Sequence, residues 1–203
     1  MTGIVLAGGK SSRMGFNKAC IEFGGKRLIE ATVDCLKAIF PEVLIIANDP
    51  PLYADLGVKV IPDLIPDSGS LGGIYTGLSA ASHPACFFVA CDMPFLNADL
   101  IKLLICEAEG WDVVVPLVGG ELQPLHAVYA KSCLPLIKEA IDGGVLKIAR
   151  FFPKAKVKII EESAIRAVDP HLLGFMNVNT PPELDQAEAI RRHPHRYQRS
   201  SDS

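Results

Sequence analysis

Short apolar runs rich in Val and Ile alternate with longer amphipathic stretches through most of this 203-residue sequence. This alternation constrains the fold more than any other feature. It is typical of β-α-β units, in which helices cover both faces of a mainly parallel sheet. A chain of this length can bury a substantial core as one unit. The sequence therefore predicts a single Rossmann-like, three-layer α/β/α domain.

The first half of the chain carries the more regular pattern. There we expect strands at 3–7, 43–47, 58–61, 86–91 and 112–115, and helices at 28–40, 72–81 and 99–108. In the second half we expect strands at 125–130, 156–160 and 175–178, helices at 132–141 and 182–191, and a helical turn at 145–151. We expect the domain to cover residues 1–191. Residues 192–203 have no apolar period and are expected to form a disordered tail.

Composition excludes several classes of protein. Apolar residues make up 49% of the chain and charged residues 21%, which excludes intrinsic disorder. No apolar run reaches the roughly 18 residues of a membrane span, and the N-terminus has no export signal, so we expect a cytoplasmic protein. The six cysteines form no C-x-x-C pair. We expect reduced core thiols rather than a metal site or a disulfide framework.

Charge is distributed unevenly along the chain. The formal net charge is −3, but residues 191–203 contain four arginines and one aspartate, so the rest of the chain carries −6. With this negative charge, the chain outside residues 191–203 is not expected to present the broad basic surface that binds nucleic acid. A polyanionic ligand would have to be met by a local cationic site.

The segment after the first expected strand is a candidate for such a site. Ligands of open α/β sheets bind beyond the carboxyl ends of the strands. Residues 8–18 carry three glycines, two hydroxyls, no carboxylate and three cations, Lys10, Arg13 and Lys18. Glycines let backbone N–H groups approach phosphate oxygens, and the cations neutralise phosphate charge. We expect a phosphate-binding loop; the alternative is a flexible loop with a solvated cationic face.

The spacing in this loop differs from two familiar phosphate-binding patterns. A Walker A motif needs G-x-x-x-x-G-K-[ST], whereas five residues separate Gly9 from Gly15 and Phe16 follows. The dinucleotide fingerprint G-x-G-x-x-G is also absent. The sequence therefore favours neither a P-loop NTPase nor an NAD enzyme.

The run L-A-G-G-x-S-x-R-M-G-x-x-K, from Leu6 to Lys18, resembles the signature of nucleotidyltransferases with the glycosyltransferase-A-like fold. Within these, the sequence is most similar to the molybdenum cofactor guanylyltransferases. Further motifs follow in the family's order: V-I-P-D at 60–63, G-S-L-G-G at 69–73, C-D-M-P-F at 91–95, Q-P-L at 123–125 and N-V-N-T-P at 177–181. The family usually has proline where this chain has Ser70, which predicts a more mobile loop there.

The resemblance implies transfer of GMP from GTP to the terminal phosphate of molybdenum-molybdopterin. It implies Mg²⁺ as cofactor, GTP and molybdopterin as partners, and molybdoenzyme-maturation proteins as recipients of the product; neither nucleic acid nor a membrane is expected. The alternatives are a molybdopterin cytidylyltransferase, a sugar-phosphate nucleotidyltransferase and a nucleotide-binding regulatory module. L-A-G-G rather than L-A-A-G favours guanine, sugar enzymes usually carry an added C-terminal domain, and a mere binder would not need both Lys18 and Asp92.

The resemblance also implies residue roles. The backbone of Leu6, Ala7 and Gly8 contacts the guanine and ribose, and Arg13 and Lys18 face the triphosphate. Arg13 could instead pair with a surface acid, and Lys10 occupies a variable position of the signature. The implied nucleotide-binding set is Leu6, Ala7, Gly8, Gly9, Lys18, Asp63, Gly72 and Asp92, and the implied catalytic set is Arg13, Lys18, Asp92, Asn177 and Asn179.

Carboxylates follow two of the expected strands. Asp92 ends the apolar run 87–91 at the carboxyl edge of the sheet, where it is interpreted as a Mg²⁺ ligand because hard cations prefer carboxylate oxygens and bridge to phosphates. The alternative is an Asx turn or a helix cap. The resemblance makes Asp63 a nucleotide contact, and Asp67 competes for that role. A solvated turn carboxylate is the alternative for both.

The motif at 177–181 has a structural and a functional component. Thr180 as N-cap, followed by proline and then Glu183 at N3, predicts a capping box. Asn177 and Asn179 are not explained in this way, and the resemblance places them near the reaction centre, where amides can orient the substrate phosphate or support the metal. Two further candidates, expected in a segment on the acceptor side, are Gln123 and His126.

Overall fold

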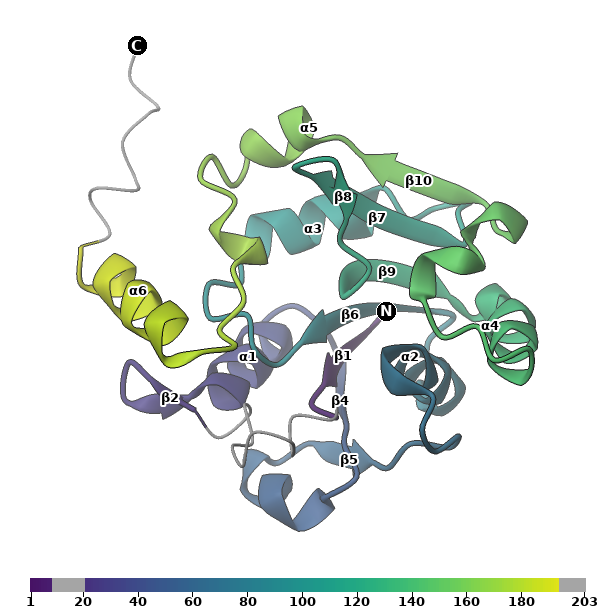
Figure 1. Ribbon diagram of the computed structural model, residues 1–203, viewed down its shortest axis with the longest axis horizontal. Helices are drawn as coiled ribbons and strands as arrows, with labels where there is room; N and C mark the ends of the chain where they lie inside the picture. Colours follow the sequence, from purple (N-terminus) through teal and green to yellow (C-terminus); the bar gives the residue numbers. More distant parts are fainter. Residues whose placement is uncertain (9–20, 194–203) are drawn as a thin grey trace.

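A central twisted sheet runs through the molecule with helices on both of its faces (Figure 1). The structure is a computed structural model and describes residues 1–8 and 21–193. The strand order is β10-β7-β9-β6-β1-β4-β5, and β8 pairs with β7 off this path. The strands are β1 Thr2–Leu6, β4 Glu42–Ile46, β5 Lys59–Ile61, β6 Ala85–Ala90, β7 Val113–Val118, β8 Glu121–Leu122, β9 His126–Ala130 and β10 Val157–Ile160.

Along the seven-strand path of the central sheet, four of the six strand pairs are parallel, which agrees with the mainly parallel sheet that the sequence predicts. Strand β1 pairs in parallel with β4 and β6, β4 with β5, and β10 with β7. Strand β9 is antiparallel to both of its neighbours, β6 and β7. The chain order reverses at β1, because β4 and β5 lie on one side of it and β6 on the other. Ligands of open α/β sheets bind outside the carboxyl ends of the strands at such a reversal.

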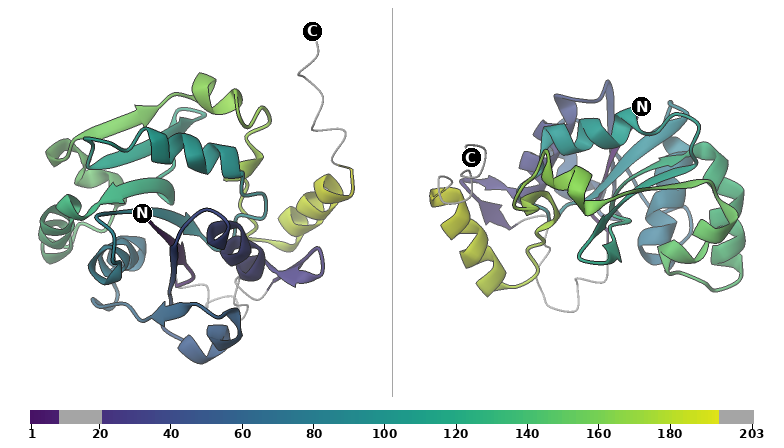
Figure 2. Two further views of the ribbon diagram at one scale, coloured as in Figure 1. Left: turned by 180° about the vertical axis from the view of Figure 1, so that it is seen from behind. Right: turned by 90° about the horizontal axis from the view of Figure 1, so that it is seen from above.

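The helices form the two outer layers, and Figure 2 shows α3 and α4 on opposite sides of the sheet. On β1 the side chain of Val5 faces the core cluster of α1, α3 and α5, whereas Ile4 and Leu6 face the cluster of α2 and α4. This alternation follows from the two-residue period of a strand. The three-layer prediction is confirmed. The helices are α1 Leu28–Lys37, α2 Gly69–Ala80, α3 Ala98–Cys106, α4 Leu134–Asp142, α5 Glu162–Arg166 and α6 Pro181–Arg192.

The prediction of a strand at 175–178 is wrong. A 3₁₀ turn, Leu173–Phe175, is followed by a segment without regular structure. The backbone N–H of Val178 donates a hydrogen bond to Asp92 O (2.8 Å), and Asp92 lies in the loop after β6. Val178 is therefore bonded to a loop and not to a neighbouring strand. Five described pieces were also not expected from the sequence: α5, β8, the 3₁₀ helices Pro50–Leu56 and Phe152–Lys154, and the hairpin of β2 Glu22–Phe23 with β3 Lys26–Arg27.

Helix α6 returns to the hairpin that follows the opening loop. The carboxylate of Glu188 accepts a hydrogen bond from Gly24 N (2.9 Å), and the Arg191 guanidinium lies 5.8 Å from the centre of the Phe23 ring. Val178 and Ala187 are buried in the same small cluster as Phe23. These contacts hold α6 against the β2–β3 hairpin, next to Val178, whose backbone N–H is bonded to Asp92.

The described cysteines are free thiols: Cys86, Cys91 and Cys133 are buried, as expected of core thiols, whereas Cys35 is half-buried and Cys106 is exposed. Cys20 lies outside the described residues. Burial raises the pKa of the Cys86 and Cys133 thiols to about 12, so both are protonated at neutral pH. Among the helices of residues 1–8 and 21–193, none is long and apolar enough to cross a membrane.

Candidate active site

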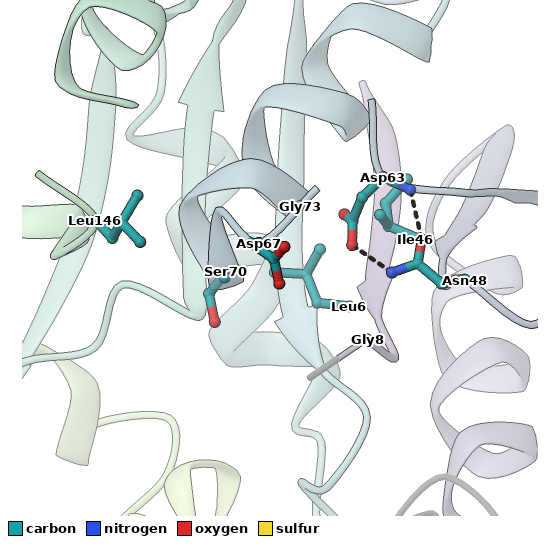
Figure 3. Close-up of a pocket in the computed structure, with 10 residues that line it drawn as sticks. Leu6, Gly8, Ile46, Asn48, Asp63, Asp67, Ser70, Gly73 and Leu146 are labelled. Carbon is teal, nitrogen blue, oxygen red and sulfur yellow. Dashed lines mark hydrogen bonds between the residues drawn. The ribbon is translucent and has the colours of Figure 1, made fainter. Parts of the chain in front are cut away.

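A cavity of about 430 Å³ opens at the carboxyl ends of β1 and β4, beside the first turn of α2 (Figure 3). Its floor and walls come from the ends of these strands, from the turn between β5 and α2, and from the loop after α4. The lining residues are Leu6, Gly8, Ile46, Asn48, Asp63, Asp67, Gly69, Ser70, Gly73 and Leu146.

Asn48 and Asp63 hold each other in the cavity wall. The amide Nδ2 of Asn48 donates to Asp63 Oδ2 (2.9 Å), and Asp63 N donates to Asn48 Oδ1 (2.9 Å). Strands β4 and β5 pair with Ile46 opposite Ile61, so the two residues lie at equivalent positions just beyond their strands. The pairing fixes one carboxylate oxygen and leaves the other oxygen of Asp63 available to a ligand. Both residues line the cavity; the sequence predicts a ligand contact at Asp63, whereas no sequence motif points to Asn48.

The turn that carries Asp63 is fastened to α2. The buried hydroxyl of Thr76 accepts a hydrogen bond from Leu64 N (2.9 Å) and donates to Gly72 O (2.9 Å). A carboxylate on an anchored turn keeps its orientation when a ligand arrives, which is the kind of preorganisation that binding sites need.

Small residues bring the backbone close to this carboxylate. A Cβ added to Gly8 would lie 3.7 Å from Asp63 Oδ2, and one added to Gly73 would lie 3.0 Å from the Leu6 side chain. Gly72 serves a different need, because a Cβ there would lie 2.6 Å from the Ser68 Cβ. The structure therefore places Gly73 at the cavity and Gly72 in the packing of the first turn of α2.

The sequence offers Asp67 as an alternative to Asp63 for the contact to the nucleotide. The structure puts both carboxylates in the lining of the cavity. Asp67 has a left-handed backbone with φ of 58°, a conformation that Asp tolerates better than most residues. The following glycine, Gly69, also has a positive φ of 56° and lines the cavity. The described lining contains no Lys or Arg, so its fixed charge is negative.

Asp92 lies at the same edge of the sheet, one strand further along. The N–H of Cys91 donates to Leu6 O (3.2 Å), which continues the β1–β6 pairing and places Asp92 beside Ala7 and Gly8. Val178 N bonds to Asp92 O, so Asn177 and Asn179 flank the residue that touches Asp92. The chain is therefore folded so that Asp92 and Val178, which are 86 positions apart in the sequence, meet.

The two asparagines have different surroundings. Asn177 is partly buried and its amide donates to Phe175 O (3.5 Å), whereas Asn179 is exposed. The N–H of Asn179 donates to the Glu183 carboxylate (2.6 Å). Thr180 and Glu183 form the predicted capping box at the start of α6. The cap explains why this segment is fixed in place.

His126 and Gln123 do not form a polar surface for an acceptor. His126 is 0% exposed, and its ring lies 5.2 Å from that of Phe87 and 4.9 Å from that of Phe175, centre to centre. Burial lowers its pKa to about 3, so the imidazole is neutral at physiological pH. Gln123 is partly buried and its amide donates to Glu121 O (3.4 Å). His126 therefore packs in the core instead of facing an acceptor.

Three of the expected site residues, Gly9, Arg13 and Lys18, lie outside the described residues, as does Lys10. Among the residues that the structure describes, no three His, Cys, Asp or Glu side chains gather in a metal-binding arrangement.

Comparisons with known proteins identify the family. The chain matches the model of the MobA-like NTP transferase domain over residues 3–157. It is 41% identical over 191 residues to the molybdenum cofactor guanylyltransferase of Desulfosudis oleivorans, covering 93% of this chain and 95% of that protein. It is 40% identical over 189 residues to the probable molybdenum cofactor guanylyltransferase of Pelotomaculum thermopropionicum, covering 93% and 92%.

Solved structures agree with the sequence comparison. The molybdopterin-guanine dinucleotide biosynthesis protein A of Archaeoglobus fulgidus superposes with a TM-score of 0.82 at 30% identity, covering 95% of this chain and 99% of that chain. The 2-C-methyl-D-erythritol 4-phosphate cytidylyltransferase of Thermus thermophilus shares the fold, with a TM-score of 0.68 at 18% identity over 93% of this chain and 98% of that chain. The chain therefore belongs to the MobA-like NTP transferases and, within them, to the molybdenum cofactor guanylyltransferase family.

Proposed function

We propose that this enzyme transfers GMP from GTP to the terminal phosphate of molybdenum-molybdopterin, with release of pyrophosphate. The observation that carries the proposal is the anchored carboxylate of Asp63 in a cavity next to Gly8. Guanine presents N1–H and N2–H₂ as donors, and an ionised carboxylate only accepts hydrogen bonds. The family membership supports the same nucleotide.

The charge of the cavity argues for the orientation of GTP. Asp63 and Asp67 would repel the triphosphate, so the base or the ribose is expected to occupy the cavity and the phosphates to point away from it. The backbone of Leu6, Ala7, Gly8 and Gly9 would then contact the nucleoside. Arg13 and Lys18 are proposed to neutralise the leaving pyrophosphate.

Mg²⁺ is proposed to bind at Asp92. Its carboxylate is a hard oxygen ligand at the edge of the sheet, and Mg²⁺ sites commonly combine one or two carboxylates with substrate phosphates. The amide oxygens of Asn177 and Asn179 lie on the segment bonded to Asp92 and would support this site. When bound, Mg²⁺ would neutralise phosphate charge and polarise the α-phosphate.

The residues of the chain would then act by positioning. A terminal phosphate oxygen of the acceptor attacks the α-phosphorus of GTP in line, a new P–O bond forms, and the bond to the bridging oxygen of pyrophosphate breaks. The nucleophile is already ionised, so no strong general base is required. His126 directly follows the Q-P-L motif at 123–125, which was expected on the acceptor side. Its imidazole is buried and neutral, which agrees with a reaction that needs no strong base.

The proposed reaction leads to two predictions, about the compartment of the enzyme and about the proteins that receive its product. We expect it to take place in the cytoplasm and to deliver its product to proteins that mature molybdoenzymes. Pull-down from cytoplasmic and membrane fractions with the product-loaded enzyme would test both expectations.

Thermal-shift measurements with GTP, CTP, ATP and UTP, each with Mg²⁺, test the nucleotide assignment. GTP should raise the melting temperature most, since a ligand at 100 times its Kd stabilises by about 2.7 kcal/mol. Guanylyl transfer to molybdopterin, followed by pyrophosphate release, then tests the reaction. Stabilisation by CTP and not by GTP would overturn the guanylyl assignment in favour of a cytidylyltransferase.

A further inference from the structure

One lining residue of the cavity comes from a distant part of the chain. Leu146 lies in the loop after α4, whereas the other described lining residues lie between positions 6 and 73. Helices α2 and α4 pack against each other, which brings this loop beside the first turn of α2. In the view of Figure 3, Leu146 lies on the opposite side of the cavity from Asp63, with Ser70 and Asp67 between them.

The two residues that precede the leucine are hydrogen-bonded to the end of α4. The N–H of Gly144 donates to Ile141 O (2.9 Å), and that of Val145 donates to Ala140 O (2.8 Å). Gly144 has φ of 73°, the left-handed conformation that ends many helices. Leu146 is nevertheless 42% exposed, so much of its apolar surface remains open to a ligand in the cavity.

The cavity therefore has two chemically different ends. One end carries the carboxylate of Asp63, which accepts hydrogen bonds, the other presents the apolar side chain of Leu146, and Asp67 lies between them. Guanine has the matching pair of properties, because donors lie on one edge of the ring system and both ring faces are apolar. A bicyclic purine held at the carboxylate end also extends further across a cavity than a single pyrimidine ring.

We propose that Leu146 contacts a face of the guanine ring and is a specificity-determining residue that favours a purine over a pyrimidine. This inference rests on the function proposed above. A pyrimidine bound at the carboxylate end leaves Leu146 uncovered, so CTP gains nothing from the leucine while GTP does.

The test is the dissociation constant for GTP and for CTP, measured by calorimetry and by competition with Mg²⁺ but without an acceptor, so that no turnover occurs. Leu146→Ala should raise the Kd for GTP by about 10-fold, the range expected for lost apolar contact in a pocket. The Kd for CTP should stay within about twofold of wild type. The preference for GTP over CTP should therefore fall.

Two further variants isolate the contact. Val145 is equally exposed at 42% and does not line the cavity, so Val145→Ala should leave the Kd for GTP unchanged. Leu146→Met keeps the apolar volume and should bind GTP as the wild type does. Because both positions are exposed, melting temperatures within about 2 °C of wild type are expected for all three variants.

Other outcomes overturn the inference. An unchanged Kd for GTP in Leu146→Ala removes the leucine from the nucleotide site, and an equal loss for GTP and CTP removes it from base discrimination. A normal Kd for GTP with a raised KM for the acceptor assigns the leucine to the acceptor instead. Failure of the proposed function is distinguishable, because it would appear in the wild-type enzyme as a lack of GTP binding or guanylyl transfer.

Discussion

The side-chain amide of Asn48 makes two hydrogen bonds of 2.9 Å to Asp63: its Nδ2 donates to the carboxylate Oδ2, and its Oδ1 accepts from the Asp63 backbone N–H. The two residues lie at matching positions beyond adjacent parallel strands, so the register of β4 against β5 creates the pair. Asn48 therefore orients the carboxylate that we propose binds guanosine.

Replacing Asn48 tests that role. Asn48→Ala removes the amide that holds Asp63, and hydrogen bonds to charged groups contribute about 1.5–3 kcal/mol, so the KM for GTP should rise roughly 10- to 100-fold. Asn48→Asp should be worse, because it sets a second carboxylate beside Asp63. Steady-state kinetics at saturating acceptor measure both effects. A KM for GTP that stays at the wild-type value in both variants would contradict the role.

Asp92 tests the proposed metal site. Asp92→Ala should lower kcat for guanylyl transfer by at least about 100-fold, the scale of losing one electrostatic partner of the transition state. The fold should persist, since Asp92 contributes its backbone carbonyl to Val178 regardless of the side chain. Asp99→Ala is the matched control, because Asp99 is an exposed carboxylate that pairs with Lys102 on α3. Wild-type turnover in Asp92→Ala would remove this residue from the mechanism.

His126 should make stability depend on pH. Burial lowers its pKa to about 3 in the folded state, against a usual value of 6.5. At a pH between these two values, the His126 imidazole is protonated in the unfolded chain and neutral in the folded chain. The unfolding free energy should therefore fall as the pH falls below 6.5, by up to about 1.4 kcal/mol per pH unit.

Denaturant unfolding between pH 7 and pH 5 checks this expectation, because paired carboxylates titrate mainly below that range. His126→Phe should flatten the curve, since phenylalanine fits an aromatic surrounding of Phe87 and Phe175 and cannot be protonated. The same slope in the variant and the wild type would show that another group is responsible.

Glu42 should control stability at lower pH, at the edge of the sheet opposite the cavity. Burial opposes its ionisation, but hydrogen bonds from Thr2, Ser82 and His83 outweigh burial and lower its pKa to about 2. The contribution is complete above pH 4.5 and is lost as the pH falls from 4.5 through 2. Glu42→Gln should cost about 2 kcal/mol at pH 7 and weaken the pH dependence below 4.5.

Acid unfolding of Glu42→Gln, followed by circular dichroism, measures this loss. Asp34→Asn is a suitable control because Asp34 is exposed and forms a surface pair with Lys26, which contributes little. An acid transition of Glu42→Gln that coincides with that of the wild type would contradict the proposed role of the Glu42 network.

The sequence by itself determined the layers, the family and much of the local structure. Fully apolar strands such as 86–89 must be covered on both faces, and capping residues such as Thr180 and Glu183 act within four positions of each other. The opening motif from Leu6 to Lys18 indicated a nucleotidyltransferase, and this motif together with the later motifs indicated the narrower family, which the comparisons confirmed.

The tertiary structure alone decided how distant segments meet. The register of β4 against β5 paired Asn48 with Asp63, and the packing of the segment before α6 joined Val178 to Asp92 instead of to a strand. The packing of α4 against α2 brought Leu146 to the cavity. Local periodicity reports which face of an element is buried, but it does not report which other element lies against that face.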